Sequence, residues 1–439
     1  MGIGKLQQEK IMLKEYAEYK ESQTVGVSKI PISWQVQHGF ALFEENKVIN
    51  KDGKQTLLLQ FNYGEIVPKK IQDAENDDKG TYLKYSVIKP GYILINGLNL
   101  NYDFVSQRVA VTNYEGAITS AYLSFKCRNR ENLDYIKYLL KGLDGIKLFH
   151  SLGSGLRQTL TSKEVLQMQL PIPPISEQNA IVKYLDYKTK QIDEFVSAKE
   201  KEIESLQELK KSLVADAVTK GISGEELVDS GIEWLPKVPK GWAVHTLRHL
   251  LKAFSEKNHS EMQLLSVTRE LGVIVRDVED TESNHNFIPD DLSNYKMVKK
   301  GQFVINKMKA WQGSYGVSDF DGIVSPAYFI FDLNFEDKDF FHLAIRSRKY
   351  ADFFARYSDG IRSGQWDLSM LDMKNIPFFV PPIEEQEKIV KYCKDKVRNI
   401  DTLISSIQKQ ITLVKELRTK LIADAVTGKI DVRDVEIPA

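Results

Sequence analysis

The chain has 439 residues, a length that predicts about three folded units rather than one compact core. Its 42% hydrophobic and 27% charged residues exclude a disordered or fibrous protein. Because 60 Lys and Arg residues balance 60 Asp and Glu residues, any grip on nucleic acid must come from local patches. The low cysteine content, the N-terminus without a signal-peptide pattern and the lack of any long apolar run predict a cytoplasmic protein.

An internal repeat is the most informative feature of the chain. The run Pro173-Pro-Ile-Ser-Glu-Gln recurs 208 residues later as Pro381-Pro-Ile-Glu-Glu-Gln. Leu213-Val-Ala-Asp-Ala-Val-Thr219 returns at the same displacement as Leu421-Ile-Ala-Asp-Ala-Val-Thr427, and Trp34 matches Trp242. A repeat of this length sets the architecture. The order is variable domain, constant segment, variable domain, constant segment.

Each constant segment is predicted to be a long helix. No Pro or Gly interrupts about 44 residues, which would make a rod of roughly 65 Å. Ser176 is a candidate N-cap, and Gly221 and Gly428 stand where the helices should end. Apolar residues alternate at spacings of three and four, which predicts a coiled-coil seam. Its members are Leu185, Ile192, Val196, Ile203 and Leu206 in the first rod, and Val397, Ile400, Ile404, Ile407, Ile411 and Val414 in the second.

The predicted fold class is α+β, with a pseudo-two-fold internal repeat and the two rods paired as an antiparallel coiled coil. Strands are expected at 56–61, 92–95 and 121–125 in the first variable domain, followed by a helix over 133–149. The second domain repeats them at 264–267, 302–305 and 327–331, with a helix over 339–357. The predicted domains are 1–170 with an N-terminal helical extension, a helical spacer at 171–221, a second domain at 222–375, a second spacer at 376–430 and a tail at 431–439.

Residues for catalysis or metal binding are not predicted. Asn375-Ile-Pro-Phe378 resembles the Asn-Pro-Pro-aromatic motif of amino-methyltransferases but lacks the central proline, so we interpret it as a connector. No phosphate-binding glycine loop precedes a helix. His245 and His249 have the spacing of two metal ligands on a helix, but Trp242 and Leu247 indicate a strand there. The sequence therefore predicts no catalytic residues, no metal site and no cofactor.

These repeated motifs resemble the specificity subunit of type I restriction–modification systems. The resemblance rests on Gly322-Ile-Val-Ser-Pro-Ala-Tyr328, the two Pro-Pro-Ile-x-Glu-Gln runs and the two rods that end Asp-Ala-Val-Thr. The first copy departs from it, with Thr119-Ser-Ala-Tyr122 in place of Val-Ser-Pro-Ala-Tyr. The resemblance implies two target-recognition domains that read a bipartite, asymmetric double-stranded DNA sequence. Methyltransferase and restriction subunits would then perform the chemistry, with S-adenosylmethionine, ATP and Mg²⁺ on those partners. Since the two rods are similar, we expect two methyltransferase subunits for each chain.

Candidate DNA-binding residues fall into two sets. Cations on the last helix and the following loop of each domain suit phosphate contacts, namely Arg157, Arg346, Arg348, Lys349 and Arg362. Lys307, Lys309 and Gln312 follow a predicted strand and have the chemistry to read base edges. For each cation, an ordinary solvated surface is the alternative interpretation. For the whole chain, the alternative is a coiled-coil protein scaffold with two end domains that binds no DNA.

Overall fold

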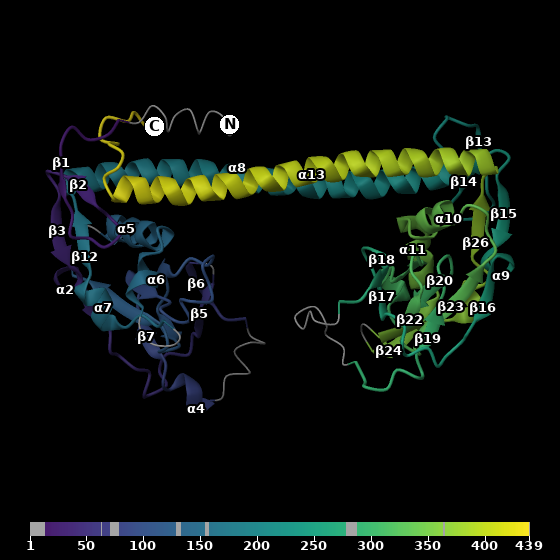
Figure 1. Ribbon diagram of the computed structural model, residues 1–439, viewed down its shortest axis with the longest axis horizontal. Helices are drawn as coiled ribbons and strands as arrows, with labels where there is room; N and C mark the ends of the chain where they lie inside the picture. Colours follow the sequence, from purple (N-terminus) through teal and green to yellow (C-terminus); the bar gives the residue numbers. More distant parts are fainter. Residues whose placement is uncertain are drawn as a thin grey trace. The chain divides into compact units, whose positions relative to one another are not determined.

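The computed structural model describes residues 14–62, 64–70, 79–128, 133–153, 158–277, 288–362 and 365–438. The chain divides into two compact units, one of Met1–Glu200 with Ile407–Ala439 and the other of Lys201–Ser406 (Figure 1). We call them unit 1 and unit 2, and their parts outside the two long helices domain 1 and domain 2. Each unit contains part of both long helices, so the units cross the predicted spacer boundaries. The predicted N-terminal extension falls on residues 1–13, outside the described residues, and 14–18 are not helical.

The two long helices form as predicted. Helix α8 spans Ile175–Lys220 with 46 residues, and α13 spans Ile383–Val426 with 44. Gly221 and Gly428 follow them with φ of 74° and 72°, a conformation that glycine adopts without steric cost. The predicted cap at Ser176 is wrong, because the helix already begins at Ile175. Instead the carbonyl of Pro174 accepts the backbone N–H groups of Glu177 and Gln178, at 2.9 and 3.0 Å.

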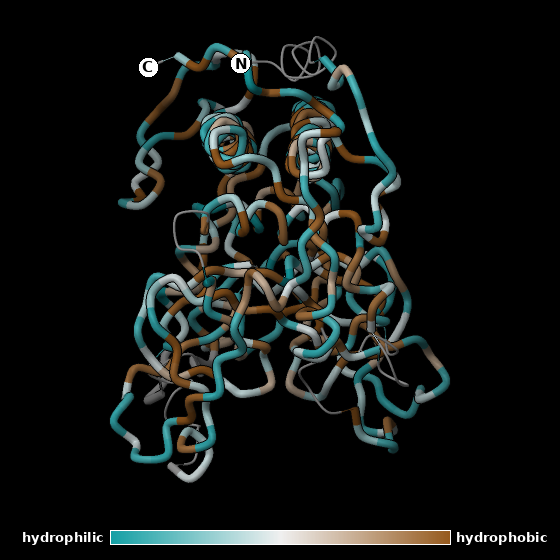
Figure 2. Tube along the Cα trace, turned by 90° about the vertical axis from the view of Figure 1, so that its left-hand side faces the viewer, coloured by the Kyte–Doolittle hydropathy of each residue, from teal (hydrophilic) through white to brown (hydrophobic). Residues whose placement is uncertain are grey.

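Within each unit, the two long helices pair with one another as a coiled coil. In unit 1, Asp193 pairs with Arg418 at 3.5 Å and Glu200 with Lys415 at 3.6 Å, so numbers rise on α8 as they fall on α13. This segment is therefore antiparallel. In unit 2, Lys210 of α8 contacts Asp401 of α13 at 2.7 Å. Figure 2 shows the helices end-on. The predicted seam residues are all buried or half-buried, whereas most positions between them are exposed.

Domain 1 is built around a four-stranded antiparallel sheet. Its strands lie in the order β4 (Phe43–Glu45), β11 (Leu123–Cys127), β8 (Tyr92–Ile95) and β9 (Val109–Val111). The described residues of domain 1 also form two-stranded sheets: β1 (Tyr19–Glu21) with β2 (Lys29–Pro31), β3 (Gln35–His38) with β12 (Gln169–Ile172), β5 (Leu59–Asn62) with β6 (Glu65–Pro68), and β7 (Ser86–Ile88) with β10 (Gly116–Ile118).

Short helices complete domain 1. They are α2 (Gly39–Leu42), α4 (Lys79–Tyr82), α5 (Leu133–Gly145), α6 (Leu148–Leu152) and α7 (Ser162–Gln167). The single helix expected over 133–149 is two helices, because Lys147 adopts a left-handed φ of 63° between α5 and α6. Gly142 lies so close to α13 that an added Cβ would meet Val426 Cγ2 at 2.5 Å. Side-chain size therefore limits how closely α5 can pack on the long helix.

Domain 2 repeats the topology of domain 1. Its four-stranded sheet has the order β16 (Leu251–Phe254), β23 (Tyr328–Leu333), β20 (Phe303–Asn306) and β21 (Tyr315–Val317). The matching pairs are β13 (Leu227–Asp229) with β14 (Lys237–Pro239), β15 (Ala243–Thr246) with β26 (Pro377–Val380), β17 (Leu265–Thr268) with β18 (Gly272–Val275), and β19 (Lys296–Val298) with β22 (Gly322–Val324). A further pair, β24 (Ser358–Arg362) with β25 (Gln365–Leu368), belongs to domain 2.

The helices of domain 2 are also short. They are α9 (Leu247–Leu250), the 3₁₀ turn η2 (Ala310–Gln312), α10 (Lys338–Ile345), α11 (Arg348–Arg356) and α12 (Met370–Met373). The helix expected over 339–357 is interrupted at Ser347, which is extended with φ −63° and ψ 153°. The central strands expected from sequence are present in both domains, within a few residues of their predicted bounds. His245 lies on strand β15 as predicted, but His249 lies on α9. The run Asn375–Phe378 is a connector only in its first half, because Pro377 and Phe378 belong to strand β26.

The core of each unit joins its domain to the long helices. In unit 1, buried residues of the sheet and α5 pack with Ile181 and Leu185 of α8 and with Ile422 of α13. The residues after α13 belong to the same core, since Val432 is buried and the N–H of Asp431 donates to the carbonyl of Lys14 at 2.8 Å. The segment predicted as a separate tail is thus part of unit 1. A second apolar cluster covers the other face of each sheet.

The matched tryptophans hydrogen-bond each domain to the start of a long helix, and we call these contacts the tryptophan locks. Trp34 Nε1 donates to Glu177 Oε1 of α8 at 2.8 Å, and Trp242 Nε1 donates to the carboxylate of Glu385 of α13 at 3.1 and 3.2 Å. Both pairs are 143 residues apart in sequence. The glutamates of the Pro-Pro-Ile-x-Glu-Gln runs therefore act as acceptors for the repeated tryptophans. Within the described ranges, no helix is both long and apolar enough to cross a membrane.

Candidate nucleic-acid interface

In domain 1 the loop after β8 meets the segment between α6 and α7, and in domain 2 the loop after β20 meets the end of β25, which lies between α11 and α12. The carbonyl of Gly97, after β8, accepts the N–H of Leu160 at 2.9 Å. The carbonyl of Lys307, after β20, accepts the N–H of Leu368 at 3.1 Å. These bonds join equivalent positions of the repeat. The fold thus brings together the two segments in which sequence placed the DNA-binding residues.

The predicted base-reading residues of domain 2 share one loop. Lys307 and Lys309 lie between β20 and η2, and Gln312 is the last residue of η2. Lys309 is exposed, whereas Lys307 and Gln312 are half-buried. Backbone bonds from Lys309 to Asn306 and from Gln312 to Lys309, each 3.0 Å, fold the loop into consecutive turns. Because the backbone of this loop is already fixed, a bound ligand has to order only the side chains and not the chain that carries them.

A cationic patch that sequence reasoning missed surrounds Lys307. Burial lowers the pKa of Lys296, and the neighbouring charges of Lys257 and Lys307 lower it further. Lys296 Nζ donates to the carbonyl of Tyr328 at 2.7 Å, which fixes the ammonium group there. Because the charges of Lys257 and Lys307 act on Lys296, the three ammonium groups lie near one another, and a polyanion beside them would be attracted. The three lysines come from separate segments, so no local sequence run signals the patch.

Arg346 has a different environment from the one predicted. It is half-buried at the end of α10, and its Nη2 donates to the carbonyls of Arg269 and Glu270 at 2.7 and 2.9 Å. Its Nη1 donates to the carbonyls of Gly313, at 3.4 Å, and Tyr315. Arg346 therefore ties the β17–β18 turn to the end of the loop that carries the predicted base-reading residues. We call this loop, residues 307–314, the base-reading loop. Because both terminal nitrogens of Arg346 already donate to backbone carbonyls, the structure does not support the phosphate contact predicted for this residue.

The β17–β18 turn brings a further arginine to the same loop. Arg269 is 69% exposed, and its Cγ lies 3.9 Å from the position that a Cβ on Gly313 would take. Gly313 directly follows Gln312, so Arg269 stands beside the predicted base readers. Leu271, two residues on, is also well exposed. Since hairpin and loop are far apart in sequence, residue spacing alone could not reveal this arrangement.

The other predicted phosphate contacts are spread more widely. Arg348 and Lys349 are exposed in the first turn of α11. The charge of Arg348 contributes, after the contact with Lys211, to a lowered pKa of Glu208 on α8. Arg348 is thus near enough to α8 for its charge to act on Glu208. Arg157 lies outside the described residues, and only the backbone of Arg362, the last residue of β24, is described.

A second group of cations lies in unit 1, where α5 packs on the coiled coil. Burial lowers the pKa of Lys141 to about 8, assisted by the charges of Lys137 and Arg418. Glu65 and Asp193 act in the opposite direction. Lys141 is half-buried, so this cation is poorly placed to reach a phosphate. In the part of the chain that the structure describes, no group of three or more His, Cys, Asp or Glu residues could hold a metal ion.

Comparisons with known proteins point in one direction. The sequence matches no protein-family model. It is 22% identical over 340 residues to the type I restriction enzyme MjaVIII specificity subunit of Methanocaldococcus jannaschii, covering 73% of this chain and 76% of that protein. It is 21% identical over 441 residues to the putative type I restriction enzyme MjaX specificity subunit of the same organism, covering 96% and 99%. The fold is similar to a solved chain from a type I restriction–modification system, with a TM-score of 0.59, 13% identity and coverage of 90% and 98%.

Proposed function

We propose that the two domains of the chain read the two unequal halves of one bipartite DNA target. The premise is that the chain belongs to the specificity subunits of type I restriction enzymes. The supporting observation is the pair of joined loops at equivalent positions of two domains with one topology. Both domains share the scaffold, but their loop side chains differ. Shared residues cannot distinguish two half-sites, so discrimination falls to the loops.

In this proposal, domain 2 grips its half-site through the cationic patch and the loop beside it. Lys257, Lys296 and Lys307 neutralise phosphates, while Lys309 and Gln312 reach base edges in the major groove. Lysine donors suit the O6 and N7 acceptors of guanine, and a glutamine amide suits adenine. Arg157 and Arg362 are retained as phosphate contacts from the sequence alone, because each ends a glycine-bearing segment, Gly153-Ser-Gly-Leu-Arg157 and Asp359-Gly-Ile-Arg362.

The chain contributes specificity and no catalysis in this assignment. Methyl transfer and cleavage belong to methyltransferase and restriction subunits, which carry S-adenosylmethionine, ATP and Mg²⁺. We propose two methyltransferase subunits per chain, because each unit contains a similar segment of paired helices. Native mass spectrometry of the purified methyltransferase complex tests this ratio. A mass equal to one methyltransferase subunit per chain at saturating partner would contradict it.

Methylation sequencing of a host that carries the chain with its methyltransferase partner tests the proposed function itself. We expect one motif with two specific, unequal halves separated by unspecified bases. A motif that is continuous, or methylation without sequence preference, would contradict the proposal.

Salt dependence of binding tests the patch. Replacing both Lys257 and Lys307 by Gln should reduce the slope of log K against log salt by up to about 0.9 for each phosphate that is no longer neutralised. The double variant Arg348→Gln with Lys349→Gln removes the same charge near α8 and serves as the matched control. An unchanged slope in the first variant would exclude the patch lysines from phosphate binding.

A further inference from the structure

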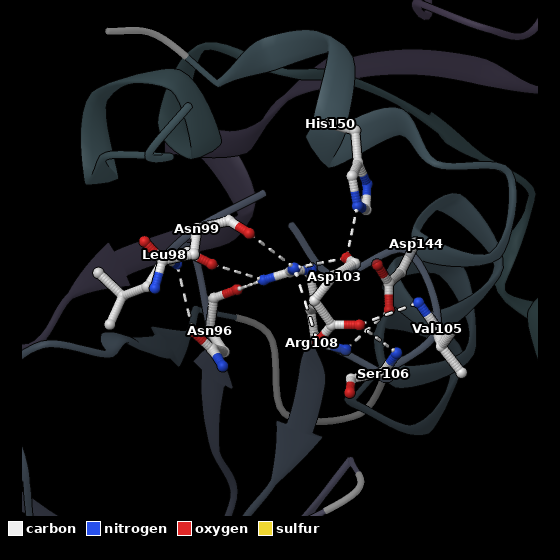
Figure 3. A network of polar contacts seen from close by, with 9 residues as sticks. All are labelled: Asn96, Leu98, Asn99, Asp103, Val105, Ser106, Arg108, Asp144 and His150. Carbon is white, nitrogen blue, oxygen red and sulfur yellow. Dashed lines mark hydrogen bonds and ion pairs between the residues drawn. The ribbon is translucent and has the colours of Figure 1, made fainter. Parts of the chain in front are cut away.

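The loop between β8 and β9 in domain 1 is fixed by a buried arginine (Figure 3). Arg108 is only 1% exposed. Its Nη1 donates to the carbonyls of Asn96 and Leu98 at 3.1 and 2.8 Å, and its Nη2 to those of Asp103 and Asn99 at 2.7 and 3.5 Å. One planar guanidinium thus binds carbonyls from both limbs of the loop. We call residues 96–108 the clamped loop.

A second anchor lies at the tip of the clamped loop. The Asp103 carboxylate accepts the N–H groups of Ser106 at 2.9 Å and Val105 at 3.0 Å. The hydrogen bond from the backbone of Ser106 is the largest influence that lowers the pKa of Asp103 to about 2. From outside the loop, His150 Nε2 approaches the carbonyl of Asp103 at 3.0 Å. The carboxylate thus remains charged and the tip stays folded at neutral pH.

This rigid loop presents large apolar side chains to solvent. Tyr102 is 77% exposed, Phe104 55% and Val105 92%. Phe104 stacks on His150 with ring centroids 4.7 Å apart, so its orientation is set, whereas Tyr102 and Val105 are more exposed. Single exposed apolar residues are ordinary, but three within four positions of a preorganised loop indicate a contact surface.

The repeat shows what kind of ligand the tip meets. The clamped loop occupies the position of the base-reading loop of domain 2, as the equivalent bonds of Gly97 and Lys307 establish. If identical partner subunits bound this position, the two copies would need similar side chains. Instead one copy carries Tyr102, Phe104 and Val105, and the other carries lysines and a glutamine. A DNA target with unequal halves requires this difference.

We propose that Tyr102, Phe104 and Val105 read thymine in the half-site bound by domain 1, by packing against the C5-methyl groups in the major groove. Thymine is the base that offers an apolar group there, and apolar side chains recognise it by contact rather than by hydrogen bonds. This inference rests on the proposed function, and it adds the chemical class of one half-site. The half-site of domain 1 contains thymine, and the methyl contacts themselves add no salt dependence to its recognition.

The test uses the complex of the full chain with its methyltransferase subunits and a duplex that carries the target found by methylation sequencing. Each thymine of the domain 1 half-site is replaced in turn by deoxyuridine, which lacks only the methyl group. Binding should weaken about fourfold for each contacted methyl, the factor that corresponds to burying one such group. Deoxyuridine in the half-site of domain 2 should have little effect.

Val105→Ala supplies the matched protein variant, because an almost fully exposed side chain can be truncated without unfolding the loop. At the methyl that Val105 contacts, this variant should prefer the thymine duplex over the deoxyuridine duplex less than the unaltered chain does. Lys309→Gln in domain 2 is the control. This variant should show the same loss of affinity as the unaltered chain when deoxyuridine replaces thymine in the domain 1 half-site.

Three outcomes would overturn the inference: a domain 1 half-site without thymine, an unchanged affinity for every deoxyuridine duplex, or an undiminished deoxyuridine effect in Val105→Ala. Loss of methyltransferase assembly in Val105→Ala would also overturn it, since a protein would then cover the tip. Failure of the proposed function would look different, because the unaltered complex would then bind no bipartite DNA sequence specifically.

Discussion

The loops that follow β8 in domain 1 and β20 in domain 2 are held by arginines that come from different places. In domain 1, Arg108 lies at the end of the loop that it clamps and is almost fully buried. In domain 2, Arg346 reaches the loop from the end of α10 and is only half-buried. Both guanidiniums donate to backbone carbonyls of four residues. A duplicated scaffold can therefore keep rigid loops at one position while their sequences, and the source of the clamp, diverge.

Replacing Arg108 by Met should have the largest effect. It would leave four part-buried carbonyls of the clamped loop without their donor, and we expect unit 1 to lose about 3 kcal/mol of unfolding free energy. Hydrogen exchange should speed up across residues 96–106 while domain 2 is unchanged. Urea denaturation followed with exchange by mass spectrometry measures both effects. Arg128→Met, at a more exposed arginine of the same domain, is the control, and an equally small loss in both variants would disprove the clamp.

Arg346→Met should perturb domain 2 in the same manner but less, by about 1–2 kcal/mol, because water can reach part of the vacated site. We expect faster exchange in two separate segments, the β17–β18 turn and residues 313–315. Discrimination between bases should fall in one half-site, since Arg269 and the base-reading loop would no longer be tied together. Faster exchange in only one of these segments would contradict the role assigned to Arg346.

The tryptophan locks provide a comparison between equivalent residues. Glu177 is buried and accepts from both Trp34 and the hydroxyl of Tyr16, whereas Glu385 is half-exposed and accepts from Trp242. Glu177→Gln should therefore cost about 1–2 kcal/mol, and Glu385→Gln less than about 1 kcal/mol. Thermal unfolding of the two variants gives the order directly. Equal losses would show that burial does not decide the strength of the lock.

A pH dependence should distinguish unit 1. Lys141 has a pKa of about 8 in the folded chain against its ordinary 10.5. Between pH 8 and pH 10.5 the unfolded chain holds a proton that the folded chain has lost, so the free energy of unfolding rises with pH in this range. Below about pH 8 Lys141 is protonated in both states, and it lowers the free energy of unfolding by a constant amount. Lys141→Gln should remove the rise and be more stable at pH 7, by about 1 kcal/mol after allowing for solvent screening. Lys163→Gln, at an exposed lysine, should behave as the unaltered chain, and parallel pH profiles for all three proteins would refute the assignment.

Periodic and repeated features could be predicted from the sequence, whereas features made by distant segments could not. The spacing of Ile400, Ile407 and Val414 showed the coiled-coil seam, and the glycines at 221 and 428 marked the helix ends. The breaks at Lys147 and Ser347 were missed, because neither residue type is a strong helix breaker and tertiary packing decides them. A single arginine in a sequence looks like surface charge. Only the fold shows that the donors of Arg108 and Arg346 are used by backbone carbonyls.

The most direct test of separate reading by the two domains is methylation sequencing with two matched variants. One carries Ala at Lys307, Lys309 and Gln312, and the other carries Ala at Tyr102, Phe104 and Val105. We expect the first to relax the motif in one half only and the second to relax it in the other half only. If either variant altered both halves, or if both altered the same half, the assignment of one half-site to each domain would be contradicted.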